Sequence, residues 1–267
     1  MCIAAWVWEA HPLYRLLLVF NRDELHDRPT EPVEWWGDGG RKILGGRDGL
    51  AGGTWLGCTR NGRIAFLTNV RETCSLPVPK SRGDIPVKFL EGEMSPIEFA
   101  EEVVEQGDLY NGFNLVLADL RSKSMVFATN RGPVAIELVS PGLHFLSNGS
   151  LDSPWPKCQR LGKGLEELLD KHCAKEVPTN QVVEQLMRDT TKANRGQLPD
   201  TGYGSDVEFE VSSIFVDAEL DMGHYRTRSI YVVAVRGNMS VSIFEEFLDG
   251  ESWKQMQVEY QIEESEK

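Results

Sequence analysis

Cys2 follows Met1 directly and opens an apolar run that continues to Trp8. Met1 is removed efficiently when the next residue is small, and its removal would leave a thiol and a free α-amine on Cys2. An α-amine titrates near pH ~8, so its neutral form can accept the proton of the thiol. One residue would then supply both the nucleophile and the base for cleavage of an amide. The alternative is that Cys2 is a small, half-buried residue at the edge of a first strand.

Four polar sites lie where predicted strands begin or end: Arg22-Asp23, Asn69, Asn148 and Arg228. Loops at strand ends hold most catalytic groups of a rigid scaffold. A thiol that attacks a carbonyl needs donors for the developing oxyanion, which asparagine amides supply without a pKa constraint. An Arg-Asp pair can orient the nucleophile or bind a carboxylate. Each asparagine alone is also an ordinary turn residue, and the Arg-Asp pair alone is also an ordinary ion pair. Their combination with Cys2 favours a functional site.

Composition limits the classes of function. The 267 residues carry a formal net charge of −13, which disfavours nucleic acids and anionic membrane surfaces as partners because both attract basic patches. The five cysteines are odd in number and include no Cys-x-x-Cys pair, which predicts free thiols in a reducing compartment. The five histidines lack the spacing of metal or haem ligands, so no metal site is predicted.

No targeting or membrane segment is expected. The N-terminus lacks a basic region before its apolar residues, which Glu9, His11 and Arg15 interrupt, so it is not typical of a signal or transit peptide. No stretch approaches the roughly 18 consecutive apolar residues of a spanning helix. These features predict a cytoplasmic protein without a transmembrane segment, and they leave open delivery to an organelle by an internal signal or a partner.

Apolar runs predict a strand-rich chain with two groups of helices. Residues 2–8 and 15–20 predict an N-terminal hairpin covered on both faces, because both runs are apolar throughout. Asn61-Gly62 predicts a second hairpin, and Ser95-Pro96-Ile97-Glu98 is a capping box that opens a helix. Further strands are expected at 113–119, 125–129, 143–147, 211–216, 229–235 and 241–247, helices at 95–106, 157–173 and 179–190, and loops at 28–53 and 194–208.

The order of these elements indicates the fold class. Clustered strands with clustered helices favour antiparallel sheets that carry helices on their outer faces over repeated βαβ units. The expected class is α+β, with four αββα layers built from two mainly antiparallel sheets. No linker, repeat or low-complexity tract interrupts the chain, so residues 1–267 are expected to form one domain.

An ordered series of motifs resembles the NRDE family, also called the transport and Golgi organisation family. The motif that names the family is Asn21-Arg22-Asp23-Glu24, followed here by Arg28-Pro29. The other matching segments are Met1-Cys2, Gly52-Gly53-Thr54-Trp55-Leu56-Gly57, Leu67-Thr68-Asn69, Tyr110-Asn111-Gly112-Phe113-Asn114-Leu115, Leu146-Ser147-Asn148 with Pro154-Trp155, and Thr227-Arg228-Ser229. The series covers almost the whole chain, in order.

The resemblance implies a fold like that of the N-terminal nucleophile hydrolases, which include the choloylglycine hydrolases. It implies that Cys2 is the nucleophile and that Asp23 orients it. Asn69 and Asn148 would polarise the carbonyl, and Arg228 would support the cysteine end. Ligand contacts are implied for the motif residues Asn21, Arg22, Glu24 and Trp55.

Two features depart from the pattern that the resemblance implies. Arg22 and Asp23 are adjacent, whereas the hydrolases space their Arg and Asp three apart. Only one of the two can therefore take the position of its counterpart. Residues 223–228 also lack the second glycine of the family's Gly-Tyr-Gly-Thr-Arg segment, which could reshape this loop.

Two functions remain open, and the sequence favours the first. The family's reported roles imply a ligand-handling protein that mobilises haem or serves acyl-CoA and lipid homeostasis, in the cytoplasm with mitochondrial or Golgi association. Haem and acyl-CoA join an apolar body to anionic groups, which Arg22 or Arg228 could bind. The second function is a thiol amidohydrolase that cleaves the C–N bond of a linear or cyclic amide. Neither function requires a cofactor, and haem enters only as a transported ligand.

Overall fold

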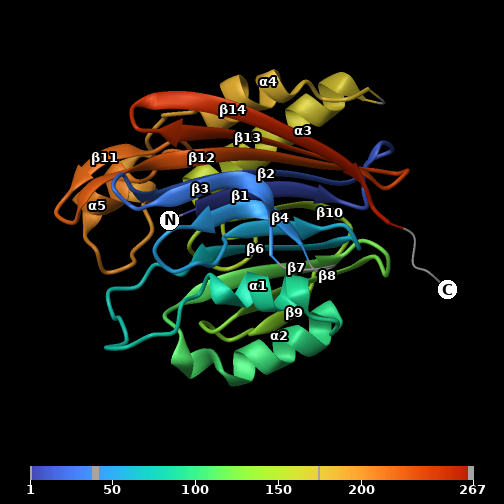
Figure 1. The fold of residues 1–267 in the computed structure, drawn as a ribbon. Coiled ribbons are helices and arrows are strands. Elements are labelled where there is room, and N and C mark those ends of the chain that lie inside the picture. The colour runs from blue at the N-terminus through green and yellow to red at the C-terminus, as the bar shows by residue number, and fades with distance from the viewer. Residues whose placement is uncertain (1, 38–41, 174, 264–267) are drawn as a thin grey trace. The chain divides into compact units, whose positions relative to one another are not determined.

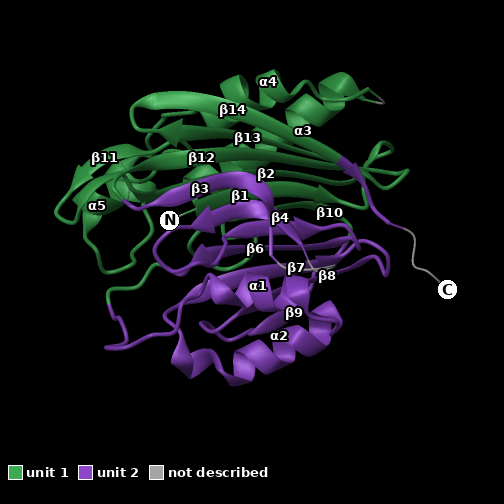
Figure 2. Cartoon of the chain, in the orientation of Figure 1, with its two compact units in different colours: residues 1–27, 71–73, 141–259 green, residues 28–70, 74–140, 260–267 purple. Residues whose placement is uncertain are grey.

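The computed structural model describes the chain except for residues 1, 38–41, 174 and 264–267 (Figure 1). The chain forms two compact units (Figure 2). Unit 1 comprises residues 1–27, 71–73 and 141–259, and unit 2 comprises residues 28–70, 74–140 and 260–267. Each unit is built on one antiparallel sheet with helices packed against it. The expectation that residues 1–267 form one domain stays a prediction.

The sheet of unit 1 contains the N-terminal hairpin. Its strands are β1 (Cys2–Trp8), β2 (Tyr14–Leu25), β10 (Gly142–Leu146), β11 (Asp217–Leu220), β12 (Gly223–Arg236), β13 (Ser240–Asp249) and β14 (Ser252–Gln261), of which β14 belongs to unit 1 up to residue 259. They lie in the order β10-β1-β2-β12-β13-β14, and β11 also pairs with β12. Every residue of β1 is buried, as its apolar composition predicts.

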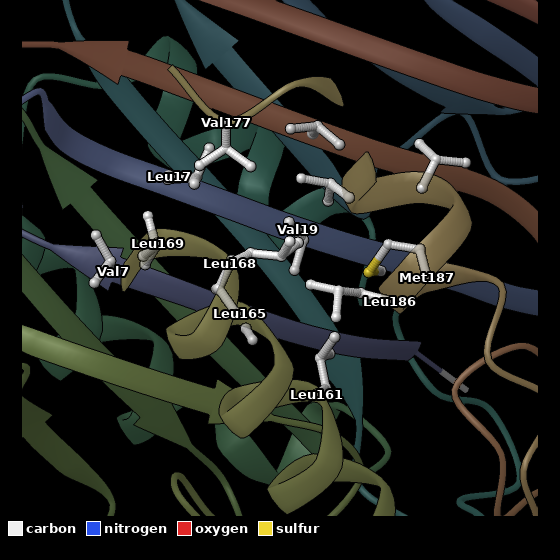
Figure 3. Packing of buried hydrophobic residues seen from close by; sticks show 14 of the residues in the cluster. Val7, Leu17, Val19, Leu161, Leu165, Leu168, Leu169, Val177, Leu186 and Met187 are labelled. Atoms are coloured by element: carbon white, nitrogen blue, oxygen red, sulfur yellow. The ribbon is translucent and has the colours of Figure 1, made fainter. Parts of the chain in front are cut away.

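Helix α3 (Pro156–His172) and the π-helix η2 (Val183–Met187) of unit 1 pack against this sheet. The other helical elements of unit 1 are α4 (Thr179–Val182), the 3-10 turn η3 (Arg195–Gln197) and α5 (Ser205–Glu210). Leu161, Leu165 and Leu168 lie on one face of α3 because they recur at intervals of three and four residues. They share a core cluster with Val7 of β1 and Val19 of β2 (Figure 3). Full burial of each leucine contributes about 1.5–3 kcal/mol, so this stripe fixes α3 on the sheet.

Unit 2 carries the second sheet. Its strands lie across the sheet in chain order: β3 (Thr30–Trp36), β4 (Ile43–Asp48), β5 (Leu56–Thr59), β6 (Arg63–Asn69), β7 (Phe113–Asp119), β8 (Ser124–Thr129) and β9 (Ile136–Leu138). Helices α1 (Asp84–Glu91) and α2 (Pro96–Glu105), followed by the 3-10 turn η1 (Gly107–Leu109), cover one face of this sheet (Figure 1). The rings of Phe89 and Phe99 join the two helices, with centroids 5.4 Å apart.

Most of the predicted elements are confirmed. The class is α+β, with two antiparallel sheets. The N-terminal hairpin, the hairpin at Asn61-Gly62 and the helices that begin near residues 95 and 157 are present. The capping box of α2 is complete, because Ser95 Oγ accepts the backbone N–H of Glu98 and the Glu98 carboxylate accepts that of Ser95. Among the described residues, none of the helices has the length and apolar composition needed to span a bilayer.

Three predicted segments were wrong. Residues 28–53 are not an irregular loop, because they contain β3 and β4, and Trp36 Nε1 joins these strands by donating to the Gly45 carbonyl at 2.8 Å. Residues 194–208 are not a plain loop, since η3 and the start of α5 lie there. The helix predicted at residues 179–190 is confirmed for residues 179–187, where α4 is followed by the π-helix η2. Residues 211–216 turn rather than extend, since the hydroxyls of Ser212 and Ser213 donate to the nearby carbonyls of Phe209 and Phe215.

Candidate active site

The first described residue of the chain lies beside the middle of the NRDE motif. Cys2 is directly opposite Arg22 in the β1–β2 pair. Directly opposed residues of an antiparallel pair project from the same face of the sheet, and successive residues of one strand alternate between faces. Cys2 and Arg22 therefore share one face of the sheet, and Asp23 projects from the other. This alternation decides which of the adjacent residues Arg22 and Asp23 lies near the thiol, because only the side chain of Arg22 is on the same face of the sheet as Cys2.

The motif residues lie inside a strand. We predicted Arg22 and Asp23 after the end of the second strand, but β2 continues through Leu25. The strand continues because β12 pairs with it along this whole stretch, with Thr227 opposite Asp23 and Tyr225 opposite Leu25. Pairing between strands that are distant in the sequence therefore extends β2 beyond its apolar run, and it buries the motif.

The thiol of Cys2 is buried. Only 8% of Cys2 is exposed. Burial raises the pKa of its thiol, and the negative charge of Asp23 raises it further, whereas Arg22 and the backbone N–H of Asp23, which donates to the sulfur, lower it. The backbone of Cys2 is held as well, since Ser147 Oγ donates to its carbonyl at 2.9 Å. The thiol is thus fixed between two strands and stays protonated near neutral pH in the absence of a base.

Asp23 is a buried carboxyl with several partners. Thr227 Oγ1 donates to its Oδ1 at 2.7 Å, and the hydroxyl of Tyr225 donates to its backbone carbonyl at 2.7 Å. Burial raises the pKa of Asp23 from 3.8 to about 6, although Lys157, the Thr227 hydroxyl and Arg22 each lower it. The free-energy cost of burying the carboxylate exceeds the stabilisation that these partners provide. Asp23 therefore changes its charge close to neutral pH.

Asn21 and Glu24, both predicted to bind a ligand, make hydrogen bonds to backbone groups of unit 1. The side-chain amide of Asn21 is buried and donates to the carbonyls of Met187, at 2.8 Å, and Ile214, at 3.0 Å. These bonds tie β2 to η2 and to the turn before β11. Glu24 accepts the backbone N–H of Leu25 at 2.9 Å. Their role in ligand binding stays a prediction.

Arg228 occupies an irregular position of β12. We predicted it just before a strand, but it lies inside β12, where the pairing with β2 shifts register between Thr227 and Ser229. The extra residue at such a bulge is re-aimed. Arg228 Nη1 donates to the carbonyls of Leu25, at 3.0 Å, and His26. Burial lowers the pKa of Arg228, as do the nearby positive charges of Arg22 and Arg226. Arg228 therefore holds the end of β2.

The two predicted asparagines lie in different units. Asn148 follows β10 in unit 1 and is buried, its Oδ1 accepts from Ser147 Oγ at 3.1 Å, and its carbonyl accepts the backbone N–H of Arg71 at 3.0 Å. Asn69 is the last residue of β6 in unit 2, opposite Phe113. Trp55 also belongs to unit 2, where it is buried and its carbonyl accepts the backbone N–H of Leu67 at 2.8 Å. Unit 1 thus holds Cys2, Asn21, Arg22, Asp23, Glu24, Asn148 and Arg228.

Sequence reasoning missed two residues of this site. Thr227 is buried and bonds the Asp23 carboxyl. Lys157 is buried at the start of α3, where its ammonium group interacts with Asp23. A signal for Lys157 was present, because it lies four residues before Leu161 and so takes a place in the apolar stripe of α3. Thr227 lay within the matching segment Thr227-Arg228-Ser229, but its partner is fixed only by the pairing of β12 with β2.

The described residues contain no group of three or more His, Cys, Asp or Glu side chains placed to hold a metal ion. The donors at the site are instead a thiol, a carboxyl, amides and guanidinium groups. This set can perform nucleophilic attack on a carbonyl, stabilise an oxyanion and bind an anionic group.

Comparison with known proteins places the chain among relatives. The family model described as Transport and Golgi organisation 2 matches residues 1–250. The Transport and Golgi organization 2 homolog of Mus musculus is 30% identical over 280 residues, which cover 98% of this chain and 100% of the mouse protein. The Homo sapiens homolog is 34% identical over 211 residues, 75% of each chain. Among solved structures, the mutant C2A of the conjugated bile acid hydrolase from Clostridium perfringens has a TM-score of 0.49 at 9% identity, covering 95% of this chain and 92% of that one.

Proposed function

The chain belongs to the Transport and Golgi organisation 2 family, and we propose that it acts as an N-terminal cysteine amidohydrolase once Met1 is removed. The observation that carries the proposal is the environment of the Cys2 thiol. The sulfur accepts the backbone N–H of Asp23 and shares a face of the sheet with Arg22. Met1 itself lies outside the described residues, so its removal is part of the proposal.

The proposed reaction proceeds through a thioester. Cys2 Sγ attacks the carbonyl carbon of the amide while the α-amine of Cys2 takes the thiol proton, which removes the need for a thiolate in the resting protein. The side-chain amide of Asn148 donates to the oxyanion that forms. The C–N bond then breaks, the amine departs with the proton from the α-amine, and an acyl group remains on the sulfur. Water hydrolyses this thioester to a carboxylic acid and restores the thiol.

The remaining residues act on Cys2 through the backbone. Arg228 binds the carbonyls of Leu25 and His26 and so fixes the end of β2. Asp23, two residues before Leu25, donates the backbone N–H that holds the sulfur. We therefore propose that Arg228 supports Cys2 indirectly, by fixing the backbone of β2 that contacts the sulfur. The role of Asn69 in the oxyanion site stays a prediction.

The test begins with the intact mass of the protein purified without an N-terminal tag. Protein that lacks Met1 is then incubated with a panel of linear N-acyl amides and cyclic amides, and released amine is measured. Rapid quenching and a second mass measurement detect an acyl group on Cys2. We expect turnover and an acyl adduct in the wild type, and neither in Cys2→Ala. Protein that lacks Met1, folds normally and gives neither turnover nor adduct across the panel would overturn the proposal.

A second proposal is that the same site handles a ligand without cleaving it. The observation that favours this function is the raised pKa of the Cys2 thiol, which opposes its use as a nucleophile. The ligand would be an amphipathic acid, haem or a long-chain acyl-CoA, with its anionic group at Arg22. Cytoplasmic, mitochondrial or Golgi placement belongs to this proposal and is tested by cell fractionation.

Binding titrations separate the two proposals. Ligand handling predicts micromolar binding of haem or acyl-CoA, weakened at least about tenfold by Arg22→Gln because a charge-assisted hydrogen bond is lost. Arg15→Gln is the matched control, since Arg15 lies on the same strand and pairs with Glu9 at 3.4 Å, away from the motif. Absence of binding to both ligands, or equal loss in the two variants, would exclude ligand handling through Arg22.

A further inference from the structure

An arginine with a buried side chain is hydrogen-bonded to the backbone of Asn148. Residues 71–73 belong to unit 1, and the backbone N–H of Arg71 donates to the Asn148 carbonyl at 3.0 Å. Asn148 is the residue whose side-chain amide is proposed above to donate to the oxyanion. Such a donor stabilises the transition state only while it is held at hydrogen-bonding distance from the developing charge. An anchor on Arg71 therefore also restrains Asn148.

The side chain of Arg71 forms a buried ion pair. Its Nε lies 2.9 Å from Oε1 of Glu208 in α5, and the two side chains are only 5% and 4% exposed. An exposed ion pair contributes little, whereas a buried pair is costly to break because a charge is then left in the interior without its partner. Thr201 Oγ1 also donates to the Glu208 carboxylate. The ion pair therefore fixes Arg71 to α5 and to the loop before it.

The loop before α5 holds the same stretch of chain by further contacts. The guanidinium carbon of Arg71 lies 5.2 Å from the centre of the Tyr203 ring, and the Tyr203 hydroxyl donates to the carbonyl of Glu72 at 2.8 Å. Gly202 has a φ of +86°, which favours glycine, and an added Cβ would lie 3.1 Å from the side chain of Thr73. The loop therefore packs against all three residues of the segment that begins at Arg71.

The space beside the ion pair does not fit a substrate group. The cavity that Arg71, Glu208 and Trp155 help to line measures ≈ 10 Å³, about the space of one water molecule. Arg71 therefore has no room to bind a substrate group from this side. Its effect on a reaction would run through Asn148, to which its backbone is bonded.

We propose that Arg71 is a positioning residue that holds Asn148 in place to donate to the oxyanion. The inference rests on the amidohydrolase function proposed above and deepens it. The Glu208 carboxylate fixes the side chain of Arg71, and the backbone N–H of Arg71 passes this restraint to the Asn148 carbonyl. The Ser147 hydroxyl contacts the Cys2 carbonyl at 2.9 Å and Asn148 Oδ1 at 3.1 Å, which places Asn148 beside the nucleophile. Loss of the ion pair loosens Asn148 relative to Cys2.

The direct test measures hydrogen exchange of the backbone N–H of Arg71 by NMR, with the backbone N–H of Thr227 as the reference. Thr227 also belongs to unit 1, and its N–H donates to the Val216 carbonyl at 2.8 Å. Glu208→Gln removes the charge that anchors Arg71 and leaves Arg71 itself intact. We expect exchange at Arg71 to accelerate at least about tenfold more than exchange at Thr227, because a local opening does not require global unfolding.

Asp206→Asn is the matched control for Glu208→Gln. Asp206 lies on the same helix and pairs with Arg195 at 2.6 Å, but the side chains of this pair are 88% and 55% exposed. An exposed pair contributes little, so this change should leave the ratio of the two exchange rates unaltered. Equal acceleration at Arg71 and Thr227 in Glu208→Gln, or no acceleration at Arg71, would overturn the proposal.

Amide turnover separates this inference from the proposed function. Glu208→Gln should lower kcat and kcat/KM equally, by at least about tenfold, because an oxyanion donor acts in the transition state. Asp206→Asn should change neither constant. Faster exchange at Arg71 with unchanged kcat would overturn the role of Arg71 in the reaction and would keep the hydrolase. Faster exchange in a protein whose wild type turns over no amide would overturn the hydrolase and leave only a structural anchor on Asn148.

A variant that fails to fold also decides the question. If Glu208→Gln does not fold, the double variant Arg71→Met with Glu208→Gln should fold, because it removes the charge left alone in the single variant. Exchange at position 71, relative to Thr227, should still be faster than in the wild type, since the ion pair is lost. Exchange as slow as in the wild type, or a double variant that also fails to fold, would overturn the proposal.

Discussion

Unit 1 buries charged side chains together, whereas unit 2 buries polar side chains one at a time against its own backbone. In unit 1, Arg22, Asp23 and Lys157 are all buried around the start of β1 and the end of β2. In unit 2, the buried Thr54 hydroxyl donates to the carbonyl of Gly46, and the buried Arg63 donates to backbone carbonyls. The first arrangement changes with pH, and the second does not.

Arg63 shows what a buried charge does in unit 2. Its Nε donates to the Phe89 carbonyl at 3.0 Å and its Nη2 to the Met94 carbonyl at 2.6 Å. The guanidinium also lies 3.8 Å from the centre of the Phe89 ring. These contacts satisfy carbonyls at the end of α1, where a helix leaves its last acceptors without partners. Such a charge stabilises local structure, whereas burial makes the ionised form of Asp23 costly.

The largest difference should appear between two buried cysteines. Burial raises the pKa of the Cys58 thiol in unit 2 to about 12. Cys2 has Arg22 and the Asp23 N–H acting against its burial. We expect Cys2→Ala to lower amide turnover at least about a thousandfold, as removal of a nucleophile does, and Cys58→Ala to leave kcat unchanged. Steady-state kinetics of the two variants, with circular dichroism for the fold, makes the comparison. Equal amide turnover in Cys2→Ala and Cys58→Ala would contradict the assignment of the reaction to the cysteine of unit 1.

The core of unit 2 should carry the largest effect on stability. Phe89 is fully buried and touches both the Phe99 ring and Arg63. Phe89→Ala leaves a cavity and should lower the free energy of unfolding by about 3–5 kcal/mol. Urea denaturation measures the loss, with Phe89→Leu as a milder control. A loss below about 1 kcal/mol would mean that the site collapses on truncation and that this core is not tightly packed.

The stability contributions of one carboxyl in unit 1 and one in unit 2 should depend on pH in opposite directions. Burial raises the pKa of Asp23 in the folded protein to about 6. The stability that this carboxyl contributes is therefore fully present below its ordinary pKa of 3.8, and it is lost as pH rises through 6. The loss amounts to about 3 kcal/mol. The free energy of unfolding of Asp23→Asn should no longer fall between about pH 4 and pH 7, because no titrating carboxyl remains at this position.

Asp48 in unit 2 is the matched carboxyl of opposite sign. Burial alone would raise its pKa, but the hydrogen bond from Arg28 Nε at 2.7 Å and those from the backbone of Ala51 and Leu50 hold the pKa below its ordinary value. Its contribution is therefore present above that value and lost as pH falls. Urea denaturation at a series of pH values measures the free energy of unfolding. Asp48→Asn should reduce its pH dependence on the acid side, whereas Asp23→Asn should reduce its pH dependence near neutral pH. The same slope change in both variants would contradict the assignment.

The parts that local pattern could predict are those whose partners lie nearby in the sequence. The apolar runs of β1 and β2, the Asn61-Gly62 turn and the leucine stripe of α3 each follow from a period or a dipeptide. The place of Cys2 behind Met1 marked it as a candidate nucleophile, and that role stays a prediction. In each case the residues that specify the structure are within a few positions of one another.

The parts that could not be predicted depend on pairing across long stretches of chain. β2 extends through the NRDE motif only because β12 pairs with it, and Arg228 sits at a bulge that this pairing creates. Lys157 interrupts an apolar stripe, and only the fold shows that its ammonium group is buried and donates to the carbonyl of Val211. Residues 28–53 looked irregular because glycine and proline punctuate them, yet β4 pairs with β5 and β3 completes the edge.

The smallest predicted effect lies at the start of α2, where unit 2 satisfies helix donors with a side chain. Ser95 Oγ accepts the Glu98 N–H at 3.4 Å, and Glu98 accepts the Ser95 N–H at 2.9 Å. In unit 1, α3 begins at Trp155 without a side-chain cap. Ser95→Ala should lower the free energy of unfolding by about 1 kcal/mol, and Ser95→Asp should restore most of it, because aspartate caps as well as serine. Neither change should affect amide turnover, since α2 belongs to unit 2, where the buried polar side chains bond to the backbone of the same unit. If Ser95→Ala lowered kcat at unchanged stability, the division into a site-bearing unit 1 and a structural unit 2 would be wrong.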